Sequence, residues 1–76
     1  IVGSGPRSAI LHASATHRTL SPNEIVLIDA GAEIFDYCVD ITRVYFTDQK
    51  TDPRRKDLYD LVCHTQRLSV EQARPG

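Results

Sequence analysis

Two aspartates, Asp29 and Asp40, stand eleven residues apart in the stretch DAGAEIFDYCVD, between two runs that are typical of strands. If these runs form a hairpin with a two-residue turn, an odd-numbered position of the first strand faces an even-numbered position of the second. Both aspartates then lie on one face of the sheet. With the turn at Phe35-Asp36 they are diagonal neighbours, and their Cβ atoms lie roughly 7 Å apart. A turn at Ile34-Phe35 keeps the same parity.

Two ionised carboxylates at this separation repel each other, and burial increases both the repulsion and the cost of removing the charges from water. Either one acid holds a proton, as in carboxylate dyads, or a cation lies between them. Carboxylate oxygens suit Mg²⁺, Ca²⁺ or Mn²⁺, and pairs of such ions about 3.5 to 4 Å apart serve in hydrolytic chemistry. The spacing of the two acids therefore fits a metal site.

A structural interpretation of the same acids stays open. In that interpretation Asp29 ends its strand as a turn residue, while Asp40 pairs with Arg43 or is exposed at a sheet edge. A calcium loop of the EF-hand type is excluded, because the sixth position counted from Asp29 is Ile34, where glycine is required. Cys38 shares a face with Asp40, but its soft sulfur suits a hard-metal site poorly.

The elements that would position the acids follow from the residue pattern. Residues 25–28 form a continuous aliphatic run typical of a strand buried on both faces, and residues 37–46 suit a pleated, partly buried surface. The first twelve residues are predicted to form two extended pieces, separated by the turn-forming sequence GSGP. A polar loop over residues 13–23 follows, and we expect it to end in a turn at residues 21–23.

A long helix is predicted from about Pro53 to Ala73. Its apolar side chains follow helical spacing, Asp52 stands at the N-cap and Pro53 at the first helical position. The basic cluster at residues 54–56 is expected to be a solvated helix start. Together these elements indicate an α+β fold that contains a β-hairpin and one long helix.

The composition is that of an ordinary soluble protein, with 41% hydrophobic residues, 25% charged residues and a formal net charge of −1. We therefore expect no nucleic-acid partner and, because no apolar run could cross a bilayer, no membrane partner. No signal-peptide pattern is present, so a cytoplasmic location is the default expectation. The chain starts without Met and stops where a helix is ending, so residues 1–76 are expected to be the N-terminal part of a longer catalytic domain.

These motifs together resemble the pita-bread metallopeptidases, and most closely aminopeptidase P and prolidase. The resemblance depends on VLIDAGAEIFDYCVDITR, with SGPRSAILHA upstream and LYDLVCHTQ downstream, and covers nearly the whole chain. It implies a partial pita-bread fold in an incomplete domain. Methionine aminopeptidase is less similar, because its HGIP-like pattern is missing after His12, and creatinase-like members lack the two aspartates.

The resemblance also implies roles for individual residues. Asp29 would chelate one divalent metal ion and Asp40 would bridge two, most often Mn²⁺, with Co²⁺ or Zn²⁺ as alternatives. His12, in AILHA, matches a histidine that lies near the reacting carbonyl of the substrate, and Thr42 would orient a carboxylate. The implied activity is hydrolysis of the peptide bond between an N-terminal residue and proline, so the expected partner is a peptide with proline in second position.

Three further ligands of this family, one histidine and two glutamates, would lie beyond Gly76. The complete protein is therefore expected to be an enzyme, whereas residues 1–76 alone should bind metal weakly and hydrolyse nothing. Two alternatives stay open: an inactive pita-bread domain that acts as a protein-binding module, and an isolated piece with only its helix partly formed. The sequence leaves aminopeptidase P and prolidase unseparated, and an oligomer of the full protein possible.

Overall fold

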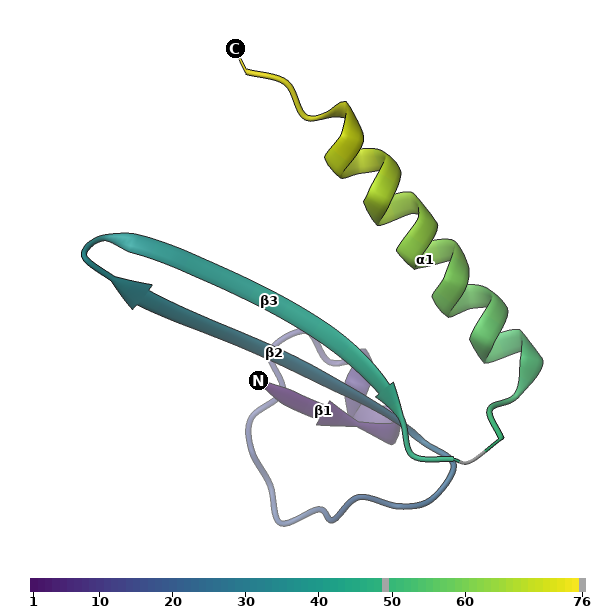
Figure 1. Cartoon of the computed structure of the whole chain (residues 1–76). Helices are drawn as coiled ribbons and strands as arrows, with labels where there is room; N and C mark the ends of the chain where they lie inside the picture. The colour runs from purple at the N-terminus through teal and green to yellow at the C-terminus, as the bar shows by residue number, and fades with distance from the viewer. Residues whose placement is uncertain (49, 76) are drawn as a thin grey trace.

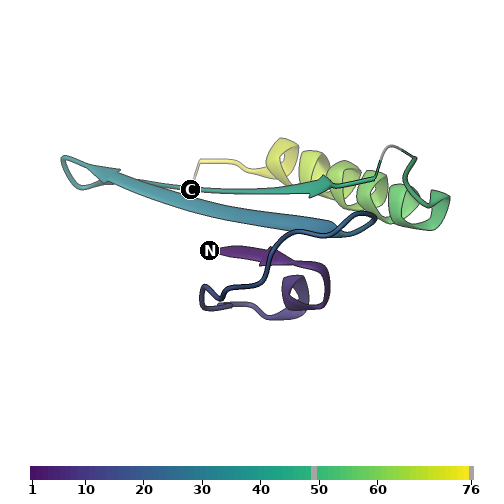
Figure 2. The same cartoon turned by 90° about the horizontal axis from the view of Figure 1, so that it is seen from below.

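A computed structural model describes residues 1–48 and 50–75. Its elements follow the order β1 (Val2–Ser4), the 3₁₀ helix η1 (Gly5–Ala9), β2 (Ile25–Ile34), β3 (Tyr37–Phe46) and α1 (Pro53–Gln72). The strands form one antiparallel sheet in the order β1-β2-β3 (Figure 1). In Figures 1 and 2, β1 and η1 lie next to β2, at one edge of the sheet, and α1 lies next to β3, at the other. The described chain thus has the predicted α+β architecture.

The long hairpin of β2 and β3 fixes which side chains share a face. The two strands pair without interruption from Ile25 opposite Phe46 to Ile34 opposite Tyr37. The turn between them has positive φ angles, 50° at Phe35 and 65° at Asp36. Two left-handed residues make the type of turn whose twist matches that of the flanking strands. Of the two turn positions that the sequence left open, the structure has the one at residues 35–36, and the predicted parity of the hairpin is confirmed.

The segment before the hairpin differs from the prediction. Residues 5–9 form η1 and residues 11–12 a turn, so the second extended piece predicted there is wrong. Gly5 enters η1 with a φ of +53°, and Pro6, at the start of the helix, has a ring that presets a helical φ. The Ser8 hydroxyl donates to the carbonyl of Gly5 over 2.8 Å, which closes the turn. These local interactions favour the tight helix over an extended strand.

The helix α1 matches its prediction closely. The side chain of Asp52 accepts a hydrogen bond from the backbone N–H of Arg54 at 2.9 Å, so the N-cap is as expected. The helix meets the sheet through an edge-to-face contact of Phe46 with Tyr59, whose ring centroids lie 5.6 Å apart. The Arg55 guanidinium also donates to the carbonyl of Asn23 at 2.9 Å. Side chains at its first turns therefore join α1 to the sheet.

Little apolar surface is buried within the described residues. Val26 and Ala13 are the buried apolar side chains there, at 6% and 7% exposure. Residues 25–28 were predicted to be buried on both faces, and this is wrong, because Ile28 is 38% exposed and its face of the sheet is largely uncovered. The other face is better covered where α1 begins: an apolar cavity of about 210 Å³ there is lined by Leu27, Val44 and neighbouring side chains. Neither helix in the part that the structure describes is long and apolar enough to span a membrane.

Candidate metal centre

The hairpin places the two aspartates on one face of the sheet. Asp29 lies opposite Thr42, and Asp40 lies opposite Gly31, as the predicted register requires. The interpretation of Asp29 as a turn residue is wrong, because β2 continues past it to Ile34. A Cβ atom at Gly31 would lie 3.1 Å from the carbonyl oxygen of Val39, so glycine here permits a close approach of the two strands across from Asp40.

One of the two carboxylates is held by a threonine. The Thr42 hydroxyl donates a hydrogen bond to Oδ1 of Asp29 at 3.0 Å. Threonine is branched at Cβ and therefore has few χ1 rotamers, which restricts where its hydroxyl can lie. The bond fixes one oxygen of Asp29 and leaves Oδ2 available for a further partner. This contact is what a carboxylate-orienting residue needs, and the orienting role itself stays a prediction.

The charges of the two aspartates are not balanced by a nearby cation in the described part of the chain. Salt bridges there join Arg18 to Glu24 and Lys56 to Asp60. Arg43 instead donates to the carbonyl of Thr42 at 2.8 Å, so its pairing with Asp40, one form of the structural alternative, is not observed. Asp40 is exposed on the edge strand β3, which is the other form of that alternative.

The pKa of Asp40 reflects the same excess of negative charge at the aspartate pair. The pKa of the Asp40 carboxyl is raised, first because its protonated form can hydrogen-bond to Asp29 and second because two carboxylates repel. A divalent cation between the two groups would remove that repulsion. The carboxylates lie on one face, and the Thr42 hydroxyl donates a hydrogen bond to one of them. Such a donor set fits a hard divalent ion.

The donor set is nevertheless incomplete within residues 1–48 and 50–75, where no three His, Cys, Asp or Glu side chains gather closely enough to hold a metal ion. Cys38 is exposed on the strand next to the acids. The groove between β3 and α1, about 690 Å³ in volume, borders the site and includes Asp40 and Thr42 in its lining. The two aspartates would therefore hold an ion together with ligands from elsewhere.

His12 lies apart from this group of residues. It is exposed in the turn that follows η1, next to the buried Ala13. In the described ranges it makes no hydrogen bond to Asp29 or Asp40. The structure thus brings Asp29, Asp40 and Thr42 together and leaves His12 on the neighbouring loop, so its contact with a substrate stays a prediction.

A second charged cluster was not predicted from the sequence. Both terminal nitrogens of the Arg18 guanidinium donate to the Glu24 carboxylate, Nη1 to Oε1 at 2.9 Å and Nη2 to Oε2 at 2.5 Å. Arg18 also donates to the Ser4 hydroxyl at 2.5 Å, and the backbone N–H of Ser21 donates to Glu24 Oε1 at 2.8 Å. Glu24 is 8% exposed and Ser4 is 7% exposed. We call these four residues the arginine clamp.

The arginine clamp is electrostatically satisfied. Hydrogen bonds from Arg18 and then from the Ser21 backbone lower the pKa of Glu24 to about 2. A Cβ atom on Gly5 would lie 2.6 Å from Oε2 of Glu24, so a larger residue there would displace the pair. The clamp joins β1, the polar loop and the start of β2. No periodic pattern marks these positions in the sequence, which is why the cluster was missed.

Comparison with known proteins agrees with the geometry of the site. The model of Metallopeptidase family M24 matches residues 1–76, and the chain belongs to this family. It is 37% identical to a Xaa-Pro aminopeptidase of Haemophilus influenzae and 36% identical to a Xaa-Pro dipeptidase of Pyrococcus horikoshii. It is also 30% identical to the mitochondrial intermediate cleaving peptidase 55 of Arabidopsis thaliana.

These matches cover the whole chain but a small part of each relative. The chain spans 18% of the Haemophilus protein, 21% of the Pyrococcus protein and 15% of the Arabidopsis protein. No solved structure matches the chain. The comparisons therefore establish the family of this chain, and they do not establish the activity of a complete protein.

Proposed function

We propose that the chain is the N-terminal part of the catalytic domain of a longer peptidase, which hydrolyses the bond between an N-terminal residue and proline. In this proposal the domain has the pita-bread fold and uses two divalent ions, most often Mn²⁺. The substrate is a peptide with proline in second position. The names of the relatives support the substrate class, and include both a Xaa-Pro aminopeptidase and a Xaa-Pro dipeptidase.

The observation that carries the proposal is the convergence of Asp29 and Asp40 on one sheet face with no described cation between them. Asp29 would hold one ion, and Asp40 would bridge two. When bound, such ions polarise a carbonyl group and lower the pKa of water, which is what peptide hydrolysis at neutral pH requires. Thr42 would hold Asp29 in place, and His12 would contact the carbonyl of the substrate.

The alternative of an inactive domain that only binds proteins has less support. Loss of catalysis would permit loss of the metal ligands, yet both aspartates are present and one is held by Thr42. The proposed protein acts in the cytoplasm, as expected from the sequence.

The test uses the full-length protein and an Ala-Pro peptide. We expect hydrolysis only after addition of a divalent ion such as Mn²⁺, and its loss after chelation. The variant Asp40→Asn should lower kcat/KM by about a thousandfold or more, because the site loses several kcal/mol of charge stabilisation when an ion is misplaced. Metal content should be measured for each protein in parallel.

Asp36→Asn is the matched control. It makes the same chemical change on the same hairpin, at a turn position whose positive φ asparagine adopts as readily as aspartate. This variant should keep wild-type activity. Full activity of Asp40→Asn at unchanged metal content would remove Asp40 from the mechanism, and hydrolysis that survives complete metal removal would refute the proposal.

A further inference from the structure

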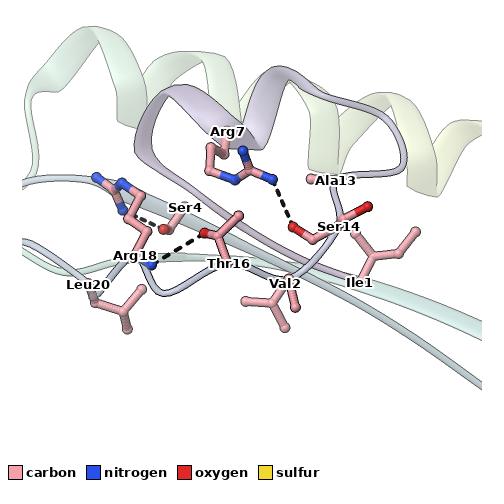
Figure 3. Close-up of a pocket in the computed structure, with 10 residues that line it drawn as sticks. Ile1, Val2, Ser4, Arg7, Ala13, Ser14, Thr16, Arg18 and Leu20 are labelled. Atoms are coloured by element: carbon pink, nitrogen blue, oxygen red, sulfur yellow. Dashed lines mark hydrogen bonds between the residues drawn. The ribbon is translucent and has the colours of Figure 1, made fainter.

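Arg7 closes the loop that carries His12. Its guanidinium Nη2 donates to the carbonyl oxygen of Ser14 at 2.7 Å, across the turn at residues 11–12. Figure 3 shows the Arg7 side chain reaching from η1 to this carbonyl, over a pocket of about 370 Å³ that both residues help to line. The bond closes residues 7–14 into a loop, and the exposed His12 is one of the residues of this loop.

The two ends of this loop rest on buried positions. A Cβ atom on the buried Gly3 of β1 would lie 3.1 Å from the Arg7 carbonyl oxygen, so the η1 backbone packs directly on the strand. The backbone N–H of Ile10 donates to the same carbonyl at 3.1 Å. On the other side, Ala13 is 7% exposed. His12 follows the exposed Leu11 and directly precedes this anchor.

The bond from Arg7 is the one side-chain hydrogen bond that spans the His12 turn in the described residues. The buried Ala13 restrains one neighbour of His12 through packing, whereas the direction of the loop after Ala13 depends on where the Ser14 carbonyl is held. Without Arg7, residues 10–14 would be joined to η1 by a single backbone hydrogen bond. Exposed turns with few contacts have the lowest local stability in a protein.

We infer that Arg7 is a positioning residue: by holding the Ser14 carbonyl, it fixes the loop that presents His12 to the substrate. The inference rests on the proposed function, because it assumes that His12 acts on a peptide. Misplacement of a reacting group by about 1 Å can reduce catalysis by about a hundredfold. Loss of the Arg7 bond should therefore affect turnover more than stability.

Arg18, in the same pocket, is the contrasting arginine. It bonds a carboxylate that is 8% exposed, so its loss would leave a nearly buried charge unpaired. Arg7 is partly exposed and donates to a neutral carbonyl oxygen. Water can donate a hydrogen bond to this oxygen once the side chain is removed. Removal of Arg7 should thus free the loop and leave the sheet intact, whereas removal of Arg18 should destabilise the sheet.

The experiment compares Arg7→Ala, Arg7→Lys and the control Arg54→Ala in the full-length, metal-loaded protein. Arg54 is an exposed arginine at the start of α1. With an Ala-Pro peptide we expect Arg7→Ala to lower kcat by about ten- to a hundredfold at nearly unchanged KM, since the loop acts in the transition state. Lysine can still donate one hydrogen bond to the carbonyl, so Arg7→Lys should recover part of kcat. The Tm of all three should stay near the wild-type value.

Hydrogen exchange of residues 8–17, measured without substrate, separates this inference from the proposed function. Arg7→Ala should speed exchange there, and Arg54→Ala should not. Unchanged exchange in Arg7→Ala overturns the inference, whatever the kinetics. Faster exchange with wild-type kcat also overturns it, because the loop then moves without consequence. If the wild-type protein hydrolyses no Xaa-Pro peptide although metal is bound, the proposed function fails and the catalytic role of Arg7 fails with it, whereas the exchange result still decides whether Arg7 holds the loop.

Discussion

Two charged pairs within the described residues have opposite characters. In the arginine clamp, Glu24 faces a guanidinium, accepts a further backbone hydrogen bond and has its pKa lowered to about 2. On the hairpin, Asp29 and Asp40 are diagonal neighbours on one face, and the pKa of Asp40 is raised instead. Both pairs adjoin β2, since Glu24 directly precedes this strand and Asp29 lies within it.

The difference in charge balance distinguishes a pair that stabilises the fold from a pair that is suited to binding a cation. The arginine clamp satisfies its own charges, so it needs no ligand and serves to join β1, the polar loop and β2. The aspartate pair increases the free energy of the folded chain unless a proton or a cation intervenes. This repulsive pair on a regular, well-paired hairpin is where the proposed divalent ions would bind.

Beyond the loss of activity expected for Asp40→Asn, the next largest effect should come from Thr42→Val. Valine keeps the shape of threonine but removes the hydroxyl that donates to Asp29 Oδ1. We expect the affinity of the full-length protein for Mn²⁺ to fall by about ten- to a hundredfold, as is typical when the partner of a ligand is lost. Isothermal titration with Mn²⁺ measures this. Unchanged affinity would show that the bond does not orient the ligand.

A smaller effect, opposite in sign for the two pairs, is expected for stability without metal. Glu24→Gln removes a charge that Arg18 needs and should lower the Tm of the metal-free full-length protein. Asp40→Asn removes a charge that repels Asp29 and should raise the Tm or leave it unchanged. Thermal unfolding followed by circular dichroism measures both.

The exposed pair of Lys56 and Asp60 supplies the control for these measurements. Asp60→Asn should shift the Tm least, because solvent screens an ion pair on a helix surface. If Glu24→Gln and Asp40→Asn changed the Tm in the same direction, the contrast between the satisfied and the repulsive pair would be wrong.

The smallest effect is a pH dependence. The folded-state pKa of Glu24, about 2, lies below its ordinary value of 4.5, so the unfolded chain binds the proton more readily. The stabilisation by the arginine clamp is then fully present above about pH 4.5 and is lost as the pH falls toward about 2. The difference in unfolding free energy between wild type and Glu24→Gln, from urea titrations, should shrink over this range. A difference that stays constant would mean that Glu24 is not the group that titrates.

The hairpin and the helix could be predicted from the sequence because local rules decide them. A two-residue turn fixes parity, so Asp29 and Asp40 had to share a face once the turn was placed. Asp52 and Pro53 mark the start of α1 in the same direct way. The aspartate pair was thus accessible from residue spacing alone.

The N-terminal segment could not be predicted in the same way. Whether residues 5–11 extend or coil depends on Gly5 and Pro6 and on packing against β1, which residue types alone leave undecided. The bonds of Arg7 and Arg18 reach 7 and 14 residues along an irregular chain, where no period relates the partners. The exposure of Ile28 was missed for another reason. An aliphatic run shows that its side chains favour burial, but it does not show whether another element covers that face of the sheet.

The turn at Phe35-Asp36 limits how this hairpin can change in length. Each residue of a strand alternates between the two faces, so insertion of one residue that shifted the register of β3 by one place, with the two-residue turn kept, would carry Asp40 to the far side of the sheet from Asp29. Insertion of two residues would restore the alternation and could be accommodated at the exposed tip. An odd change in length therefore preserves the site only if the extra residue stays in the loop, or in a bulge, so that the pairing of Asp40 with Gly31 is kept.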